Sequence, residues 1–249
     1  MASHTPSTRL AVTALGAVLL LSGCALTGKG PVRTLDADAA VAEAVTAVDL
    51  TGARRGDVEV TPGSGPGVTV RRVVHYRAGA APTPGQRVTG GVLTFSDGCR
   101  DDCWTDYRLE VPATARVRVE SSSGDITVKG VARAELTTSS GDIRAEGITG
   151  PVKARTESGR ITATALEGSE VEFRATSGDA EAGFAKAPGS VSVTTSSGNI
   201  SLTAPRAPYR LSATTASGDR DLGLADTPGA PARITLRTSS GDIRVRATP

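Results

Sequence analysis

Acidic residues recur along this 249-residue chain at one fixed place, directly after a Ser-Gly pair. A row of carboxylates could hold a cation, since hard cations such as Ca²⁺ prefer oxygen ligands. Calcium-binding repeats, however, supply several oxygen donors per short repeat, whereas each repeat here supplies one. An Asp in a turn also bonds nearby backbone groups. We therefore interpret the row as turn-capping and expect no metal and no cofactor; it comprises Asp125, Asp142, Asp179, Asn199, Asp219 and Asp242, interrupted by Arg160.

Catalysis has little support in the residues that could perform it. Serines are abundant, but a nucleophilic serine needs a base, and His75 is the one histidine left once residues 1–23 are removed. His75 has no identifiable partner motif. A polysaccharide-cleaving β-helix would need acids or bases gathered in one groove. Asp179, Glu181 and Asp221 could share a face, yet alternating charges on such a surface usually serve solvation. We predict that the chain is not an enzyme.

Cys99 and Cys103 form a close pair in the segment DGCRDDCWTDY. Three intervening residues allow the two α-carbons to come within disulfide reach. A metal site is the competing interpretation, but it would need more ligands than this chain offers nearby. We predict a Cys99–Cys103 disulfide, with free thiols as the other alternative.

Cys24 ends the stretch LSGC, which follows Arg9 and the apolar run LAVTALGAVLLL. That run is too short to span a bilayer and fits the apolar region of a signal peptide. The pattern looks like a bacterial lipobox, in which the Cys24 thiol receives a diacylglyceryl group and the chain is cut before it. An ordinary secretory signal that contains a cysteine is the alternative. Two acyl chains would anchor the protein stably in the membrane.

A repeat array from about residue 113 onward must position these groups. Ser-Gly pairs recur with their glycines 17 to 23 residues apart, a period typical of a stacked solenoid. Counted from the glycine, the same offsets are apolar in nearly every repeat and alternate with polar ones, as in strands with one buried face. The corner glycines are Gly124, Gly141, Gly159, Gly178, Gly198, Gly218 and Gly241.

Each repeat therefore reads as strand, Ser-Gly-Asp corner, strand and return loop, with about 18–20 residues per coil. The corner glycine is expected to need a positive φ or a close approach between coils. The segment RGD at Arg55–Asp57 is followed by VEV and is an earlier copy of the same corner. Arg220 is the one charged residue at a core offset. Because an unpaired buried guanidinium is costly, we expect a bulge or register shift to turn it outward.

The sequence predicts an all-β, single-domain β-solenoid with four successive parts. Residues 1–23 are a lipoprotein signal peptide and 24–47 a tether. Residues 48–112 form irregular β coils or a cap, and 113–249 form the regular repeats. In the tether, Val41, Val45 and Val48 fit either a helix or the edge of a first strand, and both remain open.

Composition and charge limit the classes of partner that the protein is expected to bind. The formal net charge is +2, which does not suggest the clustered basic face that binds nucleic acid. Aromatic residues make up 3% of the chain, which does not suit an aromatic-rich core. We expect no nucleic-acid partner. The N-terminal lipid would bind the membrane, and the remaining partner would be a component of the envelope or the cell surface.

These features resemble the family of domain of unknown function 4097, β-strand-repeat proteins of bacterial envelopes described as adhesins. The resemblance rests on the repeated S-G-D/N-I corners, on YRLEVP at 107–112 and on the LSGC motif, and it covers about residues 48–249. It implies a β-solenoid displayed outside the membrane, and it brings no catalytic residues. Arg160, Asn199 and Arg220 depart from the repeat pattern.

We therefore expect a lipid-anchored protein at the cell membrane that faces the extracellular side. It would act as an adhesion, scaffolding or partner-binding module without catalysis. The alternatives are a carbohydrate-active enzyme on a β-helix and an accessory protein of envelope-stress signalling.

Overall fold

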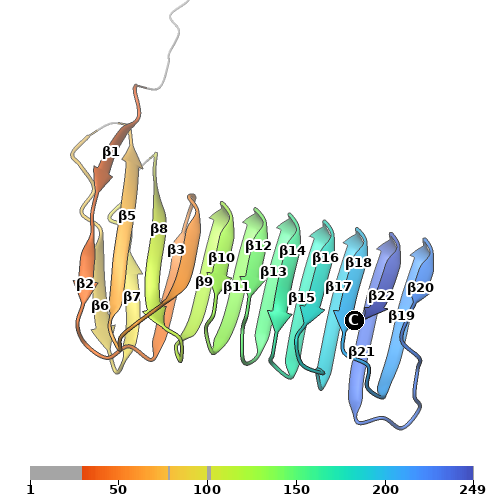
Figure 1. Ribbon diagram of the computed structural model, residues 1–249. Coiled ribbons are helices and arrows are strands. Elements are labelled where there is room, and N and C mark those ends of the chain that lie inside the picture. Colours follow the sequence, from red (N-terminus) through yellow and green to blue (C-terminus); the bar gives the residue numbers. More distant parts are fainter. Residues whose placement is uncertain (1–29, 78, 100–101, 249) are drawn as a thin grey trace, which may run out of the picture. The chain divides into compact units, whose positions relative to one another are not determined.

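The computed structural model describes residues 30–77, 79–99 and 102–248, and residues 31–249 form one compact unit. All 22 elements of the described chain are strands, which confirms the predicted all-β fold. They belong to two large sheets, and Figure 1 shows their strands stacked side by side along one axis. Within the residues covered there is no helical segment with the length and hydrophobicity that crossing a bilayer requires.

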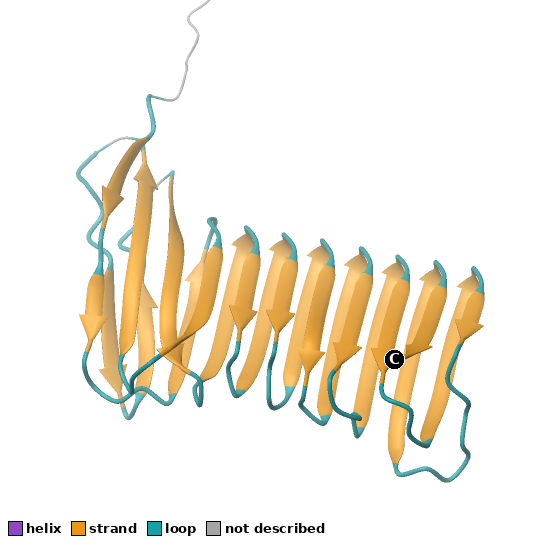
Figure 2. Cartoon of the chain, viewed as in Figure 1, coloured by secondary structure: helices purple, strands orange, loops and turns teal. Residues whose placement is uncertain are grey.

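Seven regular coils follow the pattern predicted from the sequence. Each coil places one strand in each sheet and turns at its Ser-Gly corner (Figure 2). The coils are β9 (Arg116–Ser123) with β10 (Ile126–Lys129), β11 (Arg133–Ser140) with β12 (Ile143–Glu146), β13 (Val152–Ser158) with β14 (Ile161–Leu166), β15 (Glu170–Ser177) with β16 (Ala180–Phe184), β17 (Ser190–Ser197) with β18 (Ile200–Ala204), β19 (Tyr209–Ser217) with β20 (Arg220–Leu222), and β21 (Ala232–Ser240) with β22 (Ile243–Ala247).

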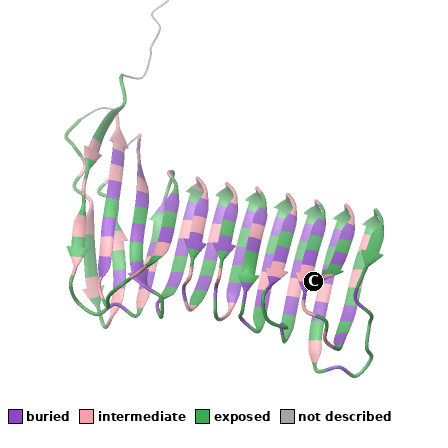
Figure 3. Ribbon diagram, in the orientation of Figure 1, coloured by how far each residue is buried: buried purple, intermediate pink, exposed green. Residues whose placement is uncertain are grey.

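The core lies between the two sheets, and equivalent residues of successive coils stack in register. Ile126 pairs with Ile143, and Ile143 with Ile161, in one sheet. Val119 and Leu136 stack likewise in the other. Figure 3 shows the resulting alternation of buried and exposed residues along the inner strands of the stack. Because every coil buries the same offsets, one repeated sequence pattern suffices to build one continuous core.

An eighth corner lies in the N-terminal part, as the sequence predicted. β3 (Ala47–Ala53) and β4 (Val58–Gly63) form a coil around Gly56, whose φ is +106°. β4 pairs in parallel with β10, and β3 with β9. The RGD segment is thus a structural corner of the solenoid.

The remaining N-terminal strands close that end of the stack. β7 (Val92–Ser96) and β8 (Cys103–Pro112) form a further coil next to β3 and β4. β5 (Val68–Tyr76) then pairs antiparallel with β8, and β6 (Gly85–Thr89) pairs antiparallel with β7. Antiparallel pairing ends the parallel array here.

The segment expected as a tether is shorter than 24–47. β1 (Arg33–Asp36) and β2 (Ala39–Val41) both pair antiparallel with β5, and Val45 is buried. The helix alternative for this segment is therefore wrong. The free edge of β5 offers main-chain partners, which makes strand pairing favourable here.

The order of coils in space differs from the order in the chain at both ends. The coil of β21 and β22 lies between β17–β18 and β19–β20. Likewise, the coil of β3 and β4 lies between β7–β8 and β9–β10. The short connections at 113–115 and 205–208 each pass over one coil. β22, which carries Arg244 and Arg246, is therefore an inner strand, and β20 is the last strand of its sheet.

Arg220 is exposed, but not for the predicted reason. β20 keeps an unbroken register with β22, Arg220 opposite Ile243 and Leu222 opposite Val245. There is no bulge; Arg220 is exposed because β20 is the last strand of its sheet. Leu222 is 43% exposed for the same reason, while Leu224 is buried.

Candidate functional site

The corner glycines have the backbone conformation predicted for them. The seven residues predicted from the sequence have φ between +117° and +156°, a region that side chains strongly disfavour. They also approach the neighbouring coil closely. A Cβ at Gly141 would lie 2.1 Å from the carbonyl oxygen of Gly124, and a Cβ at Gly124 would lie 2.1 Å from that of Gly56. The glycine is therefore required twice, by conformation and by space.

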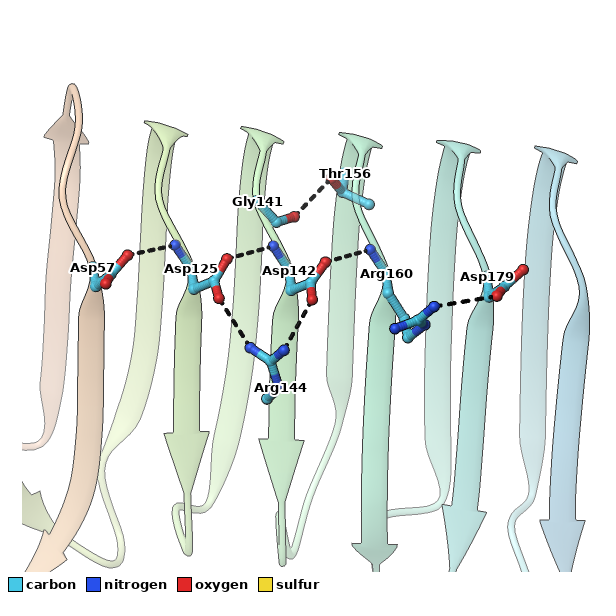
Figure 4. A network of polar contacts seen from close by, with 8 residues as sticks. All are labelled: Asp57, Asp125, Gly141, Asp142, Arg144, Thr156, Arg160 and Asp179. Atoms are coloured by element: carbon cyan, nitrogen blue, oxygen red, sulfur yellow. Dashed lines mark hydrogen bonds and ion pairs between the residues drawn. The ribbon is translucent and has the colours of Figure 1, made fainter.

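The corner acids cap the neighbouring coil, not their own turn. Asp125 Oδ1 accepts a hydrogen bond of 2.9 Å from the main-chain N–H of Asp142, and Asp57 Oδ1 accepts one of 2.9 Å from Asp125 (Figure 4). The same bond recurs from Arg160 to Asp142 and from Asp219 to Asp242. We call this chain of bonds the corner ladder. It links successive coils at every point where an acid or amide is present.

Arg160 interrupts the corner ladder, whereas Asn199 continues it. Asn199 Oδ1 accepts from the N–H of Asp242 at 2.9 Å, so a neutral amide serves as well as a carboxylate. Arg160 has no acceptor atom. Its guanidinium instead lies 3.5 Å from Asp179 Oδ2 (Figure 4). An ion pair replaces the hydrogen bond at this one step.

Arginine neutralises part of the acid row. Arg144 lies between two corner acids, with Nη1 3.1 Å from Asp125 Oδ2 and Nη2 2.9 Å from Asp142 Oδ2. Both carboxylates are thus occupied by the corner ladder on one oxygen and by Arg144 on the other. Among the described residues no group of three or more His, Cys, Asp or Glu side chains is arranged to hold a metal ion.

A second ladder, which sequence reasoning missed, runs inside the corner. Thr195 Oγ1 donates 3.1 Å to the carbonyl of Gly178, and Thr238 Oγ1 donates 3.0 Å to that of Gly198. Thr156 and Thr215 make the same bond to the corner glycine of an adjacent coil, Gly141 and Gly241 respectively. The signal was visible, because Thr recurs three residues before the corner glycine in most repeats.

His75 acquires a partner that the sequence did not reveal. Its Nε2 lies 2.9 Å from Asp106 Oδ2, and its ring stacks on Trp104 with centroids 4.8 Å apart. The other oxygen of Asp106 accepts from the N–H of Asp57 at 3.0 Å, so Asp106 starts the corner ladder. Arg55, in the corner between β3 and β4, covers Trp104. Since Asp106 is bound on both oxygens, this group fastens β5, β8 and β4 together.

A hollow of about 590 Å³ lies beside this group on the outer surface of the same sheet. Its walls carry charges of both signs, and several are already paired within the wall. Arg108 lies 3.4 Å from Glu59, and Arg71 lies 3.9 Å from Glu110 at its margin. Asp179 and Glu181, considered above as one possible group of acids, line a separate hollow of about 200 Å³ that excludes Asp221. The structure does not bring these three acids together there.

Of the three cysteines, two fall in the described part of the chain. Cys99 and Cys103 form a disulfide with their α-carbons 5.8 Å apart, as predicted. Cys103 is the first residue of β8. Cys24, the predicted lipid attachment site, lies outside the described residues.

The outer surface of the other sheet divides into two parts. On β9, β11, β13 and β15 the outward side chains carry both signs and form ion pairs, such as Arg118 with Glu120 and Lys153 with Glu172. On β17, β21 and β19 the outward residues are Ser, Thr and Arg, with Ala216 near the corner. Here Arg210 and Arg233 lie opposite each other on neighbouring strands.

The model of one family, Toastrack DUF4097, matches residues 106–246, which is more than half of the chain. The match begins at Asp106, where the corner ladder begins, and it includes all seven regular coils. No curated protein matches the chain.

Two solved structures are similar to this chain at low sequence identity. A "putative adhesin" from Bacteroides fragilis NCTC 9343 is 13% identical, with a TM-score of 0.54 over 87% of this chain and 97% of that one. A "putative cell adhesion protein" from Clostridium sporogenes ATCC 15579 is 10% identical, with a TM-score of 0.42 over 87% of this chain and all of that one. The first similarity supports the fold.

Proposed function

Because the chain belongs to the Toastrack DUF4097 family, we propose that it is a non-catalytic binding module displayed on the outside of the cell. Its sheets serve adhesion, envelope scaffolding or the binding of a partner at the surface. The similar structure from Bacteroides fragilis is named a "putative adhesin", which agrees with this role.

One observation carries the proposal: the outward rows of the two sheets are long, regular and in register. Thr137 of β11, Arg155 of β13 and Arg174 of β15 occupy equivalent outward positions on three consecutive strands. Neighbouring strands lie about 4.8 Å apart, so such a row offers a contact at each step. This geometry suits recognition spread over many weak contacts more than a focused reactive pocket.

The anchor is the second part of the proposal. Cys24 follows an apolar run and ends LSGC, so we propose that it carries a diacylglyceryl group that holds the protein on the membrane. The body then faces the extracellular side.

Fatty-acid labelling in the producing cell tests the anchor. The wild-type protein should incorporate labelled fatty acid and fractionate with membranes, whereas Cys24→Ala should do neither. Label in the mutant, or none in the wild type, would refute lipid attachment at Cys24.

A binding assay tests the module. The full-length protein should retain cell-surface material on a column and show no hydrolysis of polysaccharides, peptides or esters. His75→Ala should leave retention unchanged when the fold is intact. Hydrolysis that disappears in His75→Ala would instead establish the carbohydrate-active enzyme.

A further inference from the structure

We propose that the outer surface of β17, β21 and β19 binds a polysaccharide that carries carboxylates. This inference rests on the proposed binding function and names both the surface and the class of ligand. We call this surface the distal face; its outward residues are Ser190, Ser192, Thr194, Ser196, Arg233, Thr235, Arg237, Ser239, Arg210, Ser212, Thr214 and Ala216.

The arginines of the distal face form no ion pair with a described carboxylate; Asp226 adjoins the outer edge of β19, where its Oδ1 accepts from the main-chain N–H of Leu211. All its outward residues are described, and none of them is acidic. Arg210, Arg233 and Arg237 are exposed, and no described carboxylate lies within ion-pair distance of them. The neighbouring strand β15 of the same sheet carries outward glutamates as well as an arginine. There, Arg174 lies 2.7 Å from Glu172, and Lys153 shares the same glutamate.

Arg210 and Arg233 lie where their like charges repel each other, which lowers the stability of the sheet. They are register partners on adjacent parallel strands, so their side chains emerge on the same face about 4.8 Å apart. Like charges directly opposite each other destabilise a sheet. Bound negative charge would offset the repulsion between the two arginines. Both guanidinium groups could contact one anion, or each could contact one of two successive anions.

The spacing of the charges favours an acidic polysaccharide. Strands of the distal face follow one another every ~4.8 Å, a step comparable with the length of one sugar unit. In a polymer of uronic acids each sugar carries one carboxylate, so successive carboxylates can meet Arg233 and Arg210. The planar guanidinium binds a carboxylate with two parallel hydrogen bonds. The Ser and Thr hydroxyls alongside can donate to and accept from sugar hydroxyls.

Other polyanions fit the distal face less well. Binding of single-stranded nucleic acid relies on aromatic side chains on which bases stack, and the outward residues include none. Insertion into a membrane surface needs apolar side chains, and the outward residues of these strands are polar or charged except for Ala216. A hydrophilic polymer with spaced charges matches this composition.

The test measures binding of oligogalacturonate to the full-length protein in detergent. We expect saturable binding that weakens with salt, and no binding of a dextran oligomer of equal length. Arg210→Gln with Arg233→Gln should weaken binding by roughly tenfold or more, because two charge-assisted contacts are lost. Arg210→Lys with Arg233→Lys should weaken it less, since charge remains but the planar fork is lost.

A matched control exists in the same sheet. Arg116 and Arg133 are also register partners at the equivalent position of β9 and β11, but Glu135 follows two residues after Arg133. Arg116→Gln with Arg133→Gln removes the same charge and should leave oligogalacturonate binding within about twofold of wild type. Equal losses in the two double variants would mean general electrostatic attraction and would overturn the proposal.

The outcomes also separate this inference from the proposed function. If the wild-type protein retains cell-surface material but not oligogalacturonate, the ligand class is wrong and the binding function stands. Tighter binding of single-stranded DNA or polyglycerol phosphate than of oligogalacturonate would likewise overturn the assignment to carboxylates. If no cell-surface material is retained at all, the proposed function itself fails.

Discussion

Arg72 and Arg220 stand at the two ends of one inward-facing column of side chains. Register pairs connect them. Arg72 lies opposite Tyr107, and Ile243 lies opposite Arg220. Between these two, the column consists of Val58, Ile126, Ile143, Ile161, Ala180 and Ile200. Arg72 is 3% exposed and donates to the carbonyls of Ala37 and Gly85 and to Gln86 Oε1. Arg220 donates 3.3 Å to the carbonyl of Ala213 across the open end. Each arginine covers one end of the core with a polar group.

Replacing Arg220 with Leu should promote association of the protein through this end. A charged residue pointing inward on an edge strand discourages pairing with another chain, and Leu would remove that obstacle beside the exposed Leu222. Light scattering after size exclusion should show dimers or larger species that increase with concentration. Arg210→Leu, an outward change on β19, is the control for added hydrophobicity. A monomeric Arg220→Leu protein would contradict the role of Arg220 as an edge guard.

Replacing Arg160 with Asn should stabilise the protein. Asn199 shows that an amide can accept the N–H of the next coil, so Asn at 160 would complete the corner ladder to Asp179. The gain should be about 0.5–1 kcal/mol, reduced by loss of the exposed Arg160–Asp179 ion pair. Urea unfolding measures it. Arg160→Ala, which loses the ion pair without adding an acceptor, should show no gain, and equal stabilities for the two variants would refute the argument.

Gly141→Ala should be far more harmful than Gly147→Ala. Both glycines have positive φ, so both substitutions introduce backbone strain of about 1–3 kcal/mol. Only at Gly141 would the new Cβ also meet a neighbouring coil, since nothing lies within 4 Å of a Cβ at Gly147. The added crowding should bring the total at Gly141 to about 3 kcal/mol or more. Melting temperatures of the two variants decide the matter, and similar losses would refute the requirement for space.

Stability should fall at alkaline pH because of buried tyrosines. Burial raises the pKa of Tyr107 above its ordinary value of 10.0, with Arg72 opposing the shift, and burial likewise raises the pKa of Tyr209. The unfolded chain then loses these protons at lower pH than the folded protein. The two protonated tyrosines therefore make their full contribution to the free energy of unfolding below about pH 10. Above that pH the free energy of unfolding declines, by up to about 1.4 kcal/mol per pH unit for each tyrosine.

The tyrosine effect has a direct check. Urea midpoints measured from about pH 9 to pH 11 should fall less steeply in Tyr107→Phe than in the wild-type protein. Tyr76 resembles Tyr107 in type but not in burial, so Tyr76→Phe is the control. An unchanged slope in Tyr107→Phe would exclude its ionisation as the cause.

The coil and its corner could be predicted because each repeat must bury the same offsets. Phe173 occupies one of these offsets, and its bulky ring shares a coil with the small residues Ala180 and Ala182; all three are buried. The partner of each corner acid could not be predicted in the same way. The sequence identifies Asp125 as a capping residue, but its acceptor oxygen meets the next coil only because the N–H groups there point along the stack.

The order of the coils in space and the contacts around His75 could not be predicted from the sequence either. Every coil presents the same inward pattern, so any coil could stack on any other without loss of buried area. The contact between His75 and Asp106 depends on the antiparallel pairing of β5 with β8. Nothing in the residues of either strand alone specifies that pairing. Arg72 was missed because it occupies an apolar position of an otherwise alternating strand.

The displaced coils at both ends limit how such an array can change its length during evolution. Duplicating a repeat normally adds one unit anywhere along a solenoid. Here β3–β4 and β21–β22 are each held between coils from other parts of the chain, so an extra unit inserted beside them would separate strands that the short connections at 113–115 and 205–208 must bridge. Gain or loss of a repeat should therefore be tolerated in the interior, between β11 and β16. Length variation among relatives would then be concentrated there, while the two ends are inherited as fixed units.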